Sequence, residues 1–334
     1  MTQFISKRDL LSWLGRLTEK HIIIAPTKVA ELNLFQKVNR VEEIILDFNN
    51  TALSPKECLF PTTETLFYVE VERKDGQVEL IPVTIDQKTV IFGLRPCDAR
   101  GIALLDRPFL KEPADALYQQ HRDKITLVGL ACLTACPECF CTSMGSAPDD
   151  PSNLDILLTE VEEGYIVQIV TEKGKALLPE ELLSTTQAPP PAPPSPKAVP
   201  TEGLVQRTQQ VFDTPYWDRL ADRCIHCNLC AYVCPTCYCF DVRDYTDKGK
   251  TERVRSWESC QSLGFTRQAG NIEPRNTKGA RLRQRFAHKL LYFPKEFGAL
   301  GCVGCGRCVR VCPVNIDIRE IITDIQKLGA KGEA

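Results

Sequence analysis

The sequence predicts two folded parts: an α/β or α+β domain over residues 1–184 and a helical domain over residues 201–334 that contains repeated cysteines. In the first part, short apolar, β-branched runs alternate with helical patterns. Residues 185–200 then contain seven prolines and no aromatic residue, which is typical of a semi-rigid linker. A ligand for a proline-binding module is the alternative interpretation of this segment. Finally, one cysteine spacing occurs twice between Cys224 and Pro313.

The first domain is expected to contain mostly short strands. An amphipathic helix is predicted over about residues 6–19, where Ser6 and Asp9 resemble a capping box ahead of leucines at helical spacing. Apolar, β-branched runs predict strands at 21–25, 31–38, 44–46, 66–71, 78–83, 89–94, 125–130, 154–161 and 165–170. Other signals predict a turn at Asp75–Gly76 and helices at 99–105 and near 175–183.

The second domain is expected to be helical. Pro215 suits the first turn of a helix that leads toward Cys224, and residues 316–328 form an amphipathic pattern at the end. A long insertion at 235–301 separates the two cysteine copies.

The insertion contains a basic helix with one apolar stripe at helical spacing. The stripe consists of Leu282, Phe286 and Leu290. The basic residues are Arg275, Lys278, Arg281, Arg283, Arg285, His288 and Lys289. We interpret them as a solvated face, with docking onto an acidic redox partner as the alternative.

Each cysteine copy places three cysteines two residues apart and a fourth three residues further on, followed by proline. This spacing is typical of two-cluster ferredoxins, in which the fourth cysteine binds the other [4Fe-4S] cluster. The first cluster would take Cys224, Cys227, Cys230 and Cys312. The second cluster would take Cys302, Cys305, Cys308 and Cys234. Zinc is the weaker alternative, because a zinc ribbon needs two separate C-x-x-C pairs and no third cysteine at the same step.

Five further cysteines follow two predicted strands of the first domain. Cys97 comes after the strand at 89–94, and the other four come after the strand at 125–130. Open sheets usually bind ligands along this edge, so we expect a third [4Fe-4S] cluster there. Its ligands would be Cys97, Cys132, Cys139 and Cys141, although on spacing alone Cys136 could replace Cys132.

Four cysteines remain outside these sets. Cys237, Cys239 and Cys260 lie in the insertion, where they either bind a metal with a non-cysteine fourth ligand or support the cluster region without binding anything. The supporting role is the preferred interpretation. Cys58 is isolated, and we interpret it as a core or surface residue.

Composition excludes several functions. The formal net charge of −2 argues against binding to nucleic acid by general attraction to phosphate. No apolar run approaches the length of a membrane span, and the first residues do not resemble a signal peptide, so we expect a soluble, cytoplasmic protein. Seventeen cysteines in a chain of this length favour metal binding over disulfides and suggest an anaerobic or microaerobic host. No catalytic triad, P-loop or dinucleotide-binding glycine motif is present.

Several motifs together resemble one known family. They are CPTCYC at 234–239, WESC at 257–260, CVGCGRC at 302–308, FCTSMG at 140–145 and PTTETLF at 61–67. The chain resembles the 4Fe-4S dicluster family, which includes the A subunit of anaerobic sulfite reductase and the β subunit of cytoplasmic sulfhydrogenase. The RnfC-like subunit of acetogen methylenetetrahydrofolate reductase complexes is similar. The resemblance implies Cys97, Cys132, Cys139 and Cys141 as the third ligand set, but Cys136 departs from the sulfite reductase pattern and leaves that choice open.

The resemblance also implies a function. Such subunits carry electrons between a flavoprotein partner, linked to NAD(P)H or ferredoxin, and a catalytic subunit such as a hydrogenase, a sulfite reductase or a methylenetetrahydrofolate reductase. We therefore expect a non-catalytic iron-sulfur subunit of an oxidoreductase complex. One alternative is a flavin-dependent reductase whose N-terminal domain binds FAD or FMN beside a cluster, and another is a structural metal scaffold.

Overall fold

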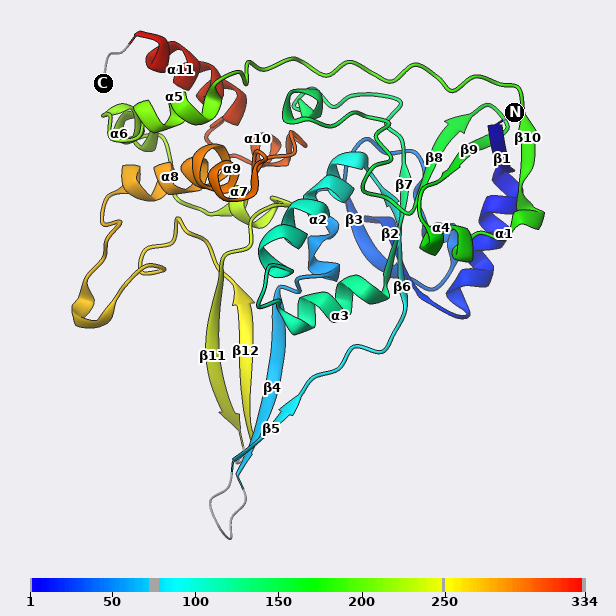
Figure 1. Ribbon diagram of the computed structural model, residues 1–334, viewed down its shortest axis with the longest axis horizontal. Helices are drawn as coiled ribbons and strands as arrows, with labels where there is room; N and C mark the ends of the chain where they lie inside the picture. Colours follow the sequence, from blue (N-terminus) through cyan, green and yellow to red (C-terminus); the bar gives the residue numbers. More distant parts are fainter. Residues whose placement is uncertain (1, 72–77, 248–249, 332–334) are drawn as a thin grey trace.

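The computed structural model describes residues 2–71, 78–247 and 250–331. Its largest layer is an eight-stranded mixed sheet with the strand order β10-β1-β9-β8-β7-β6-β2-β3 (Figure 1). The strands are β1 (Thr2–Ser6), β2 (Ile22–Val29), β3 (Leu32–Val38), β6 (Thr89–Leu94), β7 (Ile125–Leu130), β8 (Ile156–Val161), β9 (Gly164–Ile169) and β10 (Ser184–Thr186). Neighbours among β2, β6, β7 and β8 are parallel, and the outer strands are antiparallel.

Helices cover both faces of this sheet. Alternate residues of β6 enter different cores, because successive side chains of a strand point to opposite faces. Val90 and Phe92 pack with the apolar stripe of α1 (Lys7–Thr18). Ile91 and Leu94 pack with α2 (Pro96–Phe109) and α3 (Ala116–Lys124). Shorter helical segments are η1 (Val41–Glu43), η2 (Pro55–Cys58), η3 (Cys141–Met144), α4 (Glu172–Leu177) and η4 (Glu180–Leu182).

A second, four-stranded antiparallel sheet projects from the body of the molecule (Figure 1). Its strands, in spatial order, are β11 (Phe240–Asp247), β12 (Lys250–Trp257), β4 (Thr63–Val71) and β5 (Val78–Pro82). The hairpin β11–β12 comes from the insertion, whereas β4 and β5 come from the N-terminal part. The buried Arg255 of β12 forms ion pairs with Glu64 and Asp115, each at 2.5 Å. The insertion is therefore joined to the N-terminal part by a shared sheet.

The C-terminal part contains short helices around a second core. They are α5 (Leu204–Gln210), α6 (Tyr216–Ala221), α7 (Leu229–Tyr232), η5 (Ala269–Asn271), α8 (Lys278–Ala287), the π-helix η6 (His288–Tyr292), α9 (Phe293–Phe297), α10 (Arg307–Arg310) and α11 (Ile318–Lys331). Trp217, Leu282, Phe286 and Ile322 lie in this core, so the predicted apolar stripe of the insertion helix is confirmed. Residues 187–200 have no helix or strand and run from β10 to the C-terminal helices (Figure 1).

The mixed α/β arrangement of the N-terminal part is confirmed, as are most predicted elements. The strand predicted at 44–46 is wrong: these residues follow η1 without forming a strand and pack against the first core. The turn predicted at Asp75–Gly76 lies outside the described residues. Several elements were not predicted, among them β1, α3, β10, α5, β11 and β12. In the part of the chain that the structure describes, no helix has the length and apolar character needed to cross a bilayer.

The interpretation of the basic insertion helix as a solvated face is wrong for three residues. Arg281, Arg285 and Lys289 follow each other at intervals of four, and all three are buried. They lie on the inner side of the helix, because helical residues four apart share one face. Two of them reach the cysteine loops, as described below.

Candidate metal centres

The two cysteine loops repeat each other in backbone conformation as well as in sequence. His226 and Gly304 occupy equivalent positions and have φ values of 51° and 66°. Asn228 and Gly306, also equivalent, have φ values of 64° and 73°. Each loop then enters a short helix, α7 or α10. The left-handed residues turn the chain so that an amide of each loop faces a thiol: His226 N donates to Cys224 Sγ at 3.4 Å, and Gly304 N donates to Cys302 Sγ at 3.5 Å.

The first loop lines one cavity together with the last cysteine of the second loop. The cavity is lined by Cys224, Cys227, Cys230, Cys308 and Cys312. Two further donors face its sulfurs, with Ile316 N at 3.2 Å from Cys312 Sγ and Gln261 Nε2 at 3.3 Å from Cys230 Sγ. Of the seventeen cysteines, all of which lie in the described part, Cys227 alone is exposed. Among the cysteines of the three groups, Cys227 therefore lies closest to solvent.

The second loop lines a deeper cavity with the last cysteine of the first loop. Its cysteines are Cys234, Cys302, Cys305 and Cys308. Lys289 lies in the same wall and donates to Gly301 O at 3.1 Å and to Thr236 Oγ1 at 2.8 Å. Burial alone would lower the pKa of Lys289, but nearby thiols, chiefly Cys234, raise it above its ordinary value. Cys237 and Lys289 lower the pKa of the Cys234 thiol, whereas burial raises the pKa of the Cys302 thiol to about 11.

The third group of cysteines lies where two parallel strands end. Cys97 is in the first turn of α2, directly after β6, and the other four follow the neighbouring strand β7. One cavity is lined by Cys97, Cys132, Cys136, Cys139 and Cys141. Because all five line it, the choice between Cys132 and Cys136 as a ligand stays open. Burial raises the pKa of the Cys132 thiol to about 11.

Arg95 holds the two strand ends together at this third cavity. Its Nη1 donates to Leu130 O at 3.2 Å and to Ala131 O at 2.9 Å, both at the end of β7. Its Nε donates to Asn49 O at 3.2 Å, and its guanidinium lies over the Phe48 ring at 4.1 Å. Arg95 therefore joins three chain segments at the cavity wall.

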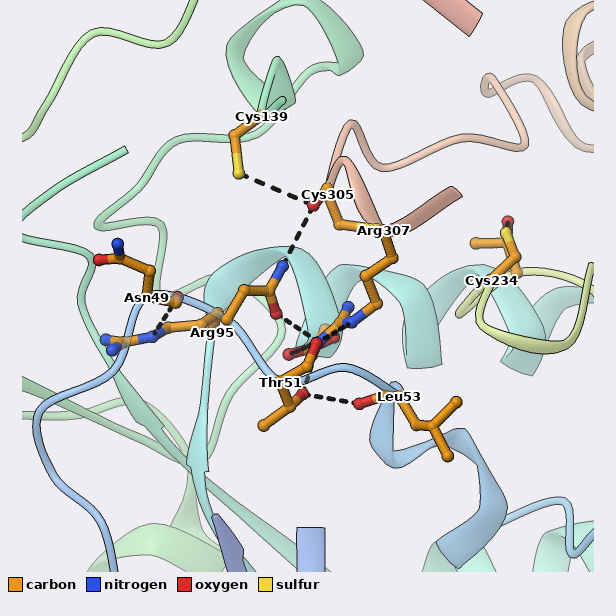
Figure 2. A network of polar contacts seen from close by, with 11 residues as sticks. Asn49, Thr51, Leu53, Arg95, Cys139, Cys234, Cys305 and Arg307 are labelled. Atoms are coloured by element: carbon orange, nitrogen blue, oxygen red, sulfur yellow. Dashed lines mark hydrogen bonds and ion pairs between the residues drawn. The ribbon is translucent and has the colours of Figure 1, made fainter. Parts of the chain in front are cut away.

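The second and third cysteine groups lie side by side, and Figure 2 shows Cys139 facing the carbonyl oxygen of Cys305. Phe140 N donates to Gly304 O at 2.8 Å, and Cys139 Sγ lies 3.7 Å from Cys305 O. Cys305 lines both of these cavities, and Cys308 lines both the second and the first. The three cysteine groups therefore form a continuous series through the molecule.

The predicted ligands fit iron-sulfur clusters by their chemistry. Each of the three cavities has at least four thiols, and the first two also have amide donors aimed at sulfur, which stabilise cluster thiolates. Across residues 2–71, 78–247 and 250–331, no three His, Cys, Asp or Glu side chains converge closely enough to hold a single metal ion. The cysteine spacing predicted these groups, but it did not predict the buried cations Arg285 and Lys289 beside them.

The cysteines outside these sets lie in two places. Cys237, Cys239 and Cys260 line a separate cavity at the base of the β11–β12 hairpin. Cys58 lies on η2, where it packs against the core that contains α2 and α3.

Comparison with known proteins gives two matches. A family model described as a 4Fe-4S dicluster domain matches residues 223–316. The protein named sulfhydrogenase 2 subunit beta, from Pyrococcus furiosus, is 30% identical over 330 residues, which cover 94% of this chain and 95% of that protein. No solved structure matches the chain.

Proposed function

The chain belongs to the family of 4Fe-4S dicluster electron-transfer subunits, and from this premise we propose that it relays single electrons between two partner proteins. The C-terminal part would be a helical, ferredoxin-like module with two clusters. Cys224, Cys227, Cys230 and Cys312 would hold the first, and Cys302, Cys305, Cys308 and Cys234 the second. The equivalent left-handed turns of the two loops support this assignment, because each turn aims an amide at a thiol.

A third cluster would be held at the edge of the eight-stranded sheet by Cys97, Cys132, Cys139 and Cys141. The observation that carries the proposal is the continuous series of cysteines, in which Cys305 and Cys308 each line two neighbouring cavities. Iron-sulfur clusters accept and donate single electrons. Three clusters in cavities that share lining cysteines would connect the N-terminal domain to the surface near Cys227.

Residues of the chain would adjust the potential of each cluster. Buried positive charge favours the reduced, more negative form of a cluster. Arg285 lines the first and second cavities, and Lys289 lines the second. Arg95 and Arg307 are the buried cations nearest the third cavity, where Arg95 forms part of the wall. Arg285, Lys289 and Arg95 would raise the reduction potentials above those of the same clusters in an uncharged setting, whereas Asp98 offsets the charge of Arg307.

The partners would be a flavoprotein linked to NAD(P)H or ferredoxin, and a catalytic subunit such as a hydrogenase, a sulfite reductase or a methylenetetrahydrofolate reductase. The relative found by comparison is named as a subunit of sulfhydrogenase 2, which supports a place in a complex of this type. The exposed Cys227 makes the first cluster the point where electrons would enter or leave.

An iron count with EPR spectroscopy on the anaerobically purified full chain tests the proposal. The two C-terminal clusters account for about eight irons per chain, and the third cluster accounts for about four more, at four irons each. Replacing Cys97 by alanine should remove about four irons, whereas replacing Cys302 should affect the dicluster module. Iron-free protein, or iron that dithionite cannot reduce, would overturn the proposal.

A flavin-binding N-terminal domain is the alternative. A cavity of about 210 Å³ lies at the same sheet edge, lined in part by Phe48, Arg95 and Tyr165. Ligand sites for molecules of drug size usually enclose roughly 300–1,000 Å³, so this cavity is small for a flavin. Stoichiometric flavin in the supernatant of denatured protein would favour the alternative, and we expect none.

A further inference from the structure

The hairpin β11–β12 brings two cysteines together that are distant in sequence. Cys239 directly precedes β11, and Cys260 lies three residues after the end of β12. Phe240 pairs with Trp257, and Glu258 N donates to Cys239 O at 2.9 Å. Antiparallel pairing thus places Cys260 beside the Cys237–Cys239 segment.

The three thiols line a cavity of about 320 Å³. Arg275, Arg285 and His288 also line it, together with Tyr238, Phe240 and Phe265. No carboxylate is among the described residues of its wall. The cavity therefore combines soft sulfur ligands with positive charge and aromatic walls, a setting suited to an anionic centre bound by thiolates.

Two buried cations at this place lack a carboxylate partner. Lys56 is buried on η2, donates to Cys237 O at 2.9 Å and lies 3.9 Å from the centre of the Trp257 ring. Arg285 is buried in the opposite element, α8, and its Nε has no hydrogen-bond partner. Within the described ranges, neither forms an ion pair with Asp or Glu. A buried cation is costly unless negative charge lies nearby. Arg285 also lines the first and second cavities, so it is Lys56, bound to Cys237 O, that specifically favours an anion at this site.

We propose that Cys237, Cys239 and Cys260 bind a fourth iron-sulfur cluster, a cubane held by three thiolates. The thiols lie along the wall of a cavity and, like the other cysteines described, do not converge on one point as the ligands of a single zinc ion must. A cubane distributes its ligands over several irons and fits that arrangement. The remaining iron takes a non-cysteine ligand, and His288 lies in the same wall.

This fourth cluster lies next to the second one. Cys237 N donates to Cys234 O at 3.4 Å, and the thiol of Cys234 lines the second cavity. Arg285 lines the first, the second and the hairpin cavities, so its charge acts on all three. The fourth cluster is therefore a side branch of the series, on the side of the projecting sheet.

The test compares iron and acid-labile sulfide in the anaerobically purified full chain and its variants. The double variant Cys239→Ala/Cys260→Ala should lose about four irons and four sulfides per chain, the content of one cubane. The matched control is Cys58→Ala, which removes a cysteine outside the cavity and should lose none. Unchanged iron in the double variant would overturn the proposal.

A second measurement does not depend on the variants folding. Anomalous diffraction from crystals of the unaltered chain, recorded above the iron edge, should show a peak between Cys239 and Cys260. A peak only at the zinc edge, or no peak there, would overturn the proposal. In that case, peaks at the three other cavities would still support the electron-relay function. The experiment therefore distinguishes failure of the fourth-cluster proposal from failure of the proposed function.

Discussion

Arg307 and Asp98 form a fully buried ion pair across 209 residues of sequence, with Nη1 at 2.6 Å from Oδ1 and both side chains about 1% exposed. Asp98 lies beside Cys97 in the first turn of α2, and Arg307 lies between Cys305 and Cys308 in the chain. Arg307 Nε also donates to Thr51 O at 2.9 Å. The pair therefore holds the second and third cysteine groups at a constant separation, which an electron relay requires.

Removing one charge of this pair should be strongly destabilising. Asp98→Asn leaves the Arg307 guanidinium buried without its countercharge, which typically costs about 3–5 kcal/mol. Anaerobic urea denaturation followed by circular dichroism measures the loss. The control is Arg310→Met, which breaks the partly exposed pair with Glu138 and should cost less than about 1 kcal/mol. Equal losses in the two variants would contradict the structural role given to the buried pair.

Gly304 should tolerate no side chain, because it touches the loop of the third cysteine group. A Cβ at this residue would lie 2.6 Å from Phe140 O and from Cys141 N. Gly304→Ala should separate the two loops and remove iron from the third cavity. Gly298→Ala is the matched control, since Gly298 has a similar φ of 70° but nothing within 4 Å of the added atom. Iron analysis of both variants should show loss in the first alone.

Arg285→Met should lower reduction potentials. Arg285 lines the first and second cavities, and removing its charge disfavours the added electron. We expect shifts on the order of tens of millivolts in an EPR-monitored redox titration. Arg283→Met alters the same helix on its outer side, where Arg283 pairs with the exposed Asp213, and should leave the potentials unchanged. A similar shift in both variants would mean that the position of Arg285 in the cavity walls is not what raises the potentials.

The first cluster should be the most easily lost. Cys227 is exposed, and its neighbours Ile225 and Leu229 are 61% and 41% exposed. Mild ferricyanide oxidation with an iron chelator should therefore release about four irons in an early phase, before the rest. The Cys227→Ala protein should lack this phase. Release of all iron in one phase from the unaltered chain would show that solvent exposure does not determine the order in which the clusters lose iron.

Sequence patterns predicted those structural features that depend only on residues close together in the chain. Three of the four proposed ligands of each C-terminal cluster lie within seven residues, so spacing alone places them in one loop. The strands β6 and β7 were predicted because they are continuous apolar runs, and the cysteines after them followed directly. Cys312 lines the first cavity and Cys234 lines the second, which is the crossed placement that the spacing predicts.

Other features depend on pairing across long distances. The strands β11 and β12 carry charges on many positions, so their sequence does not show the apolar alternation of a half-buried strand. They form because β12 pairs with β4, about 190 residues earlier, and because Arg255 finds Glu64 there. The prediction that Arg285 and Lys289 lie on a solvated face was wrong for a related reason. Helical spacing shows which residues share a face of the helix, but it does not show which other segments pack against that face.

The sequence by itself determined the family, through its motifs. It also determined the repeated cysteine loops and the strands that end at the third group, because these depend on residues that are close together in the chain. Only the tertiary structure decided that the three groups share cysteines in series, that buried cations surround them and that a hairpin brings Cys260 to Cys239. Those features form where segments that are distant in the sequence pack together. The free energy of burying a charged side chain at such a contact depends on the groups that both segments place there.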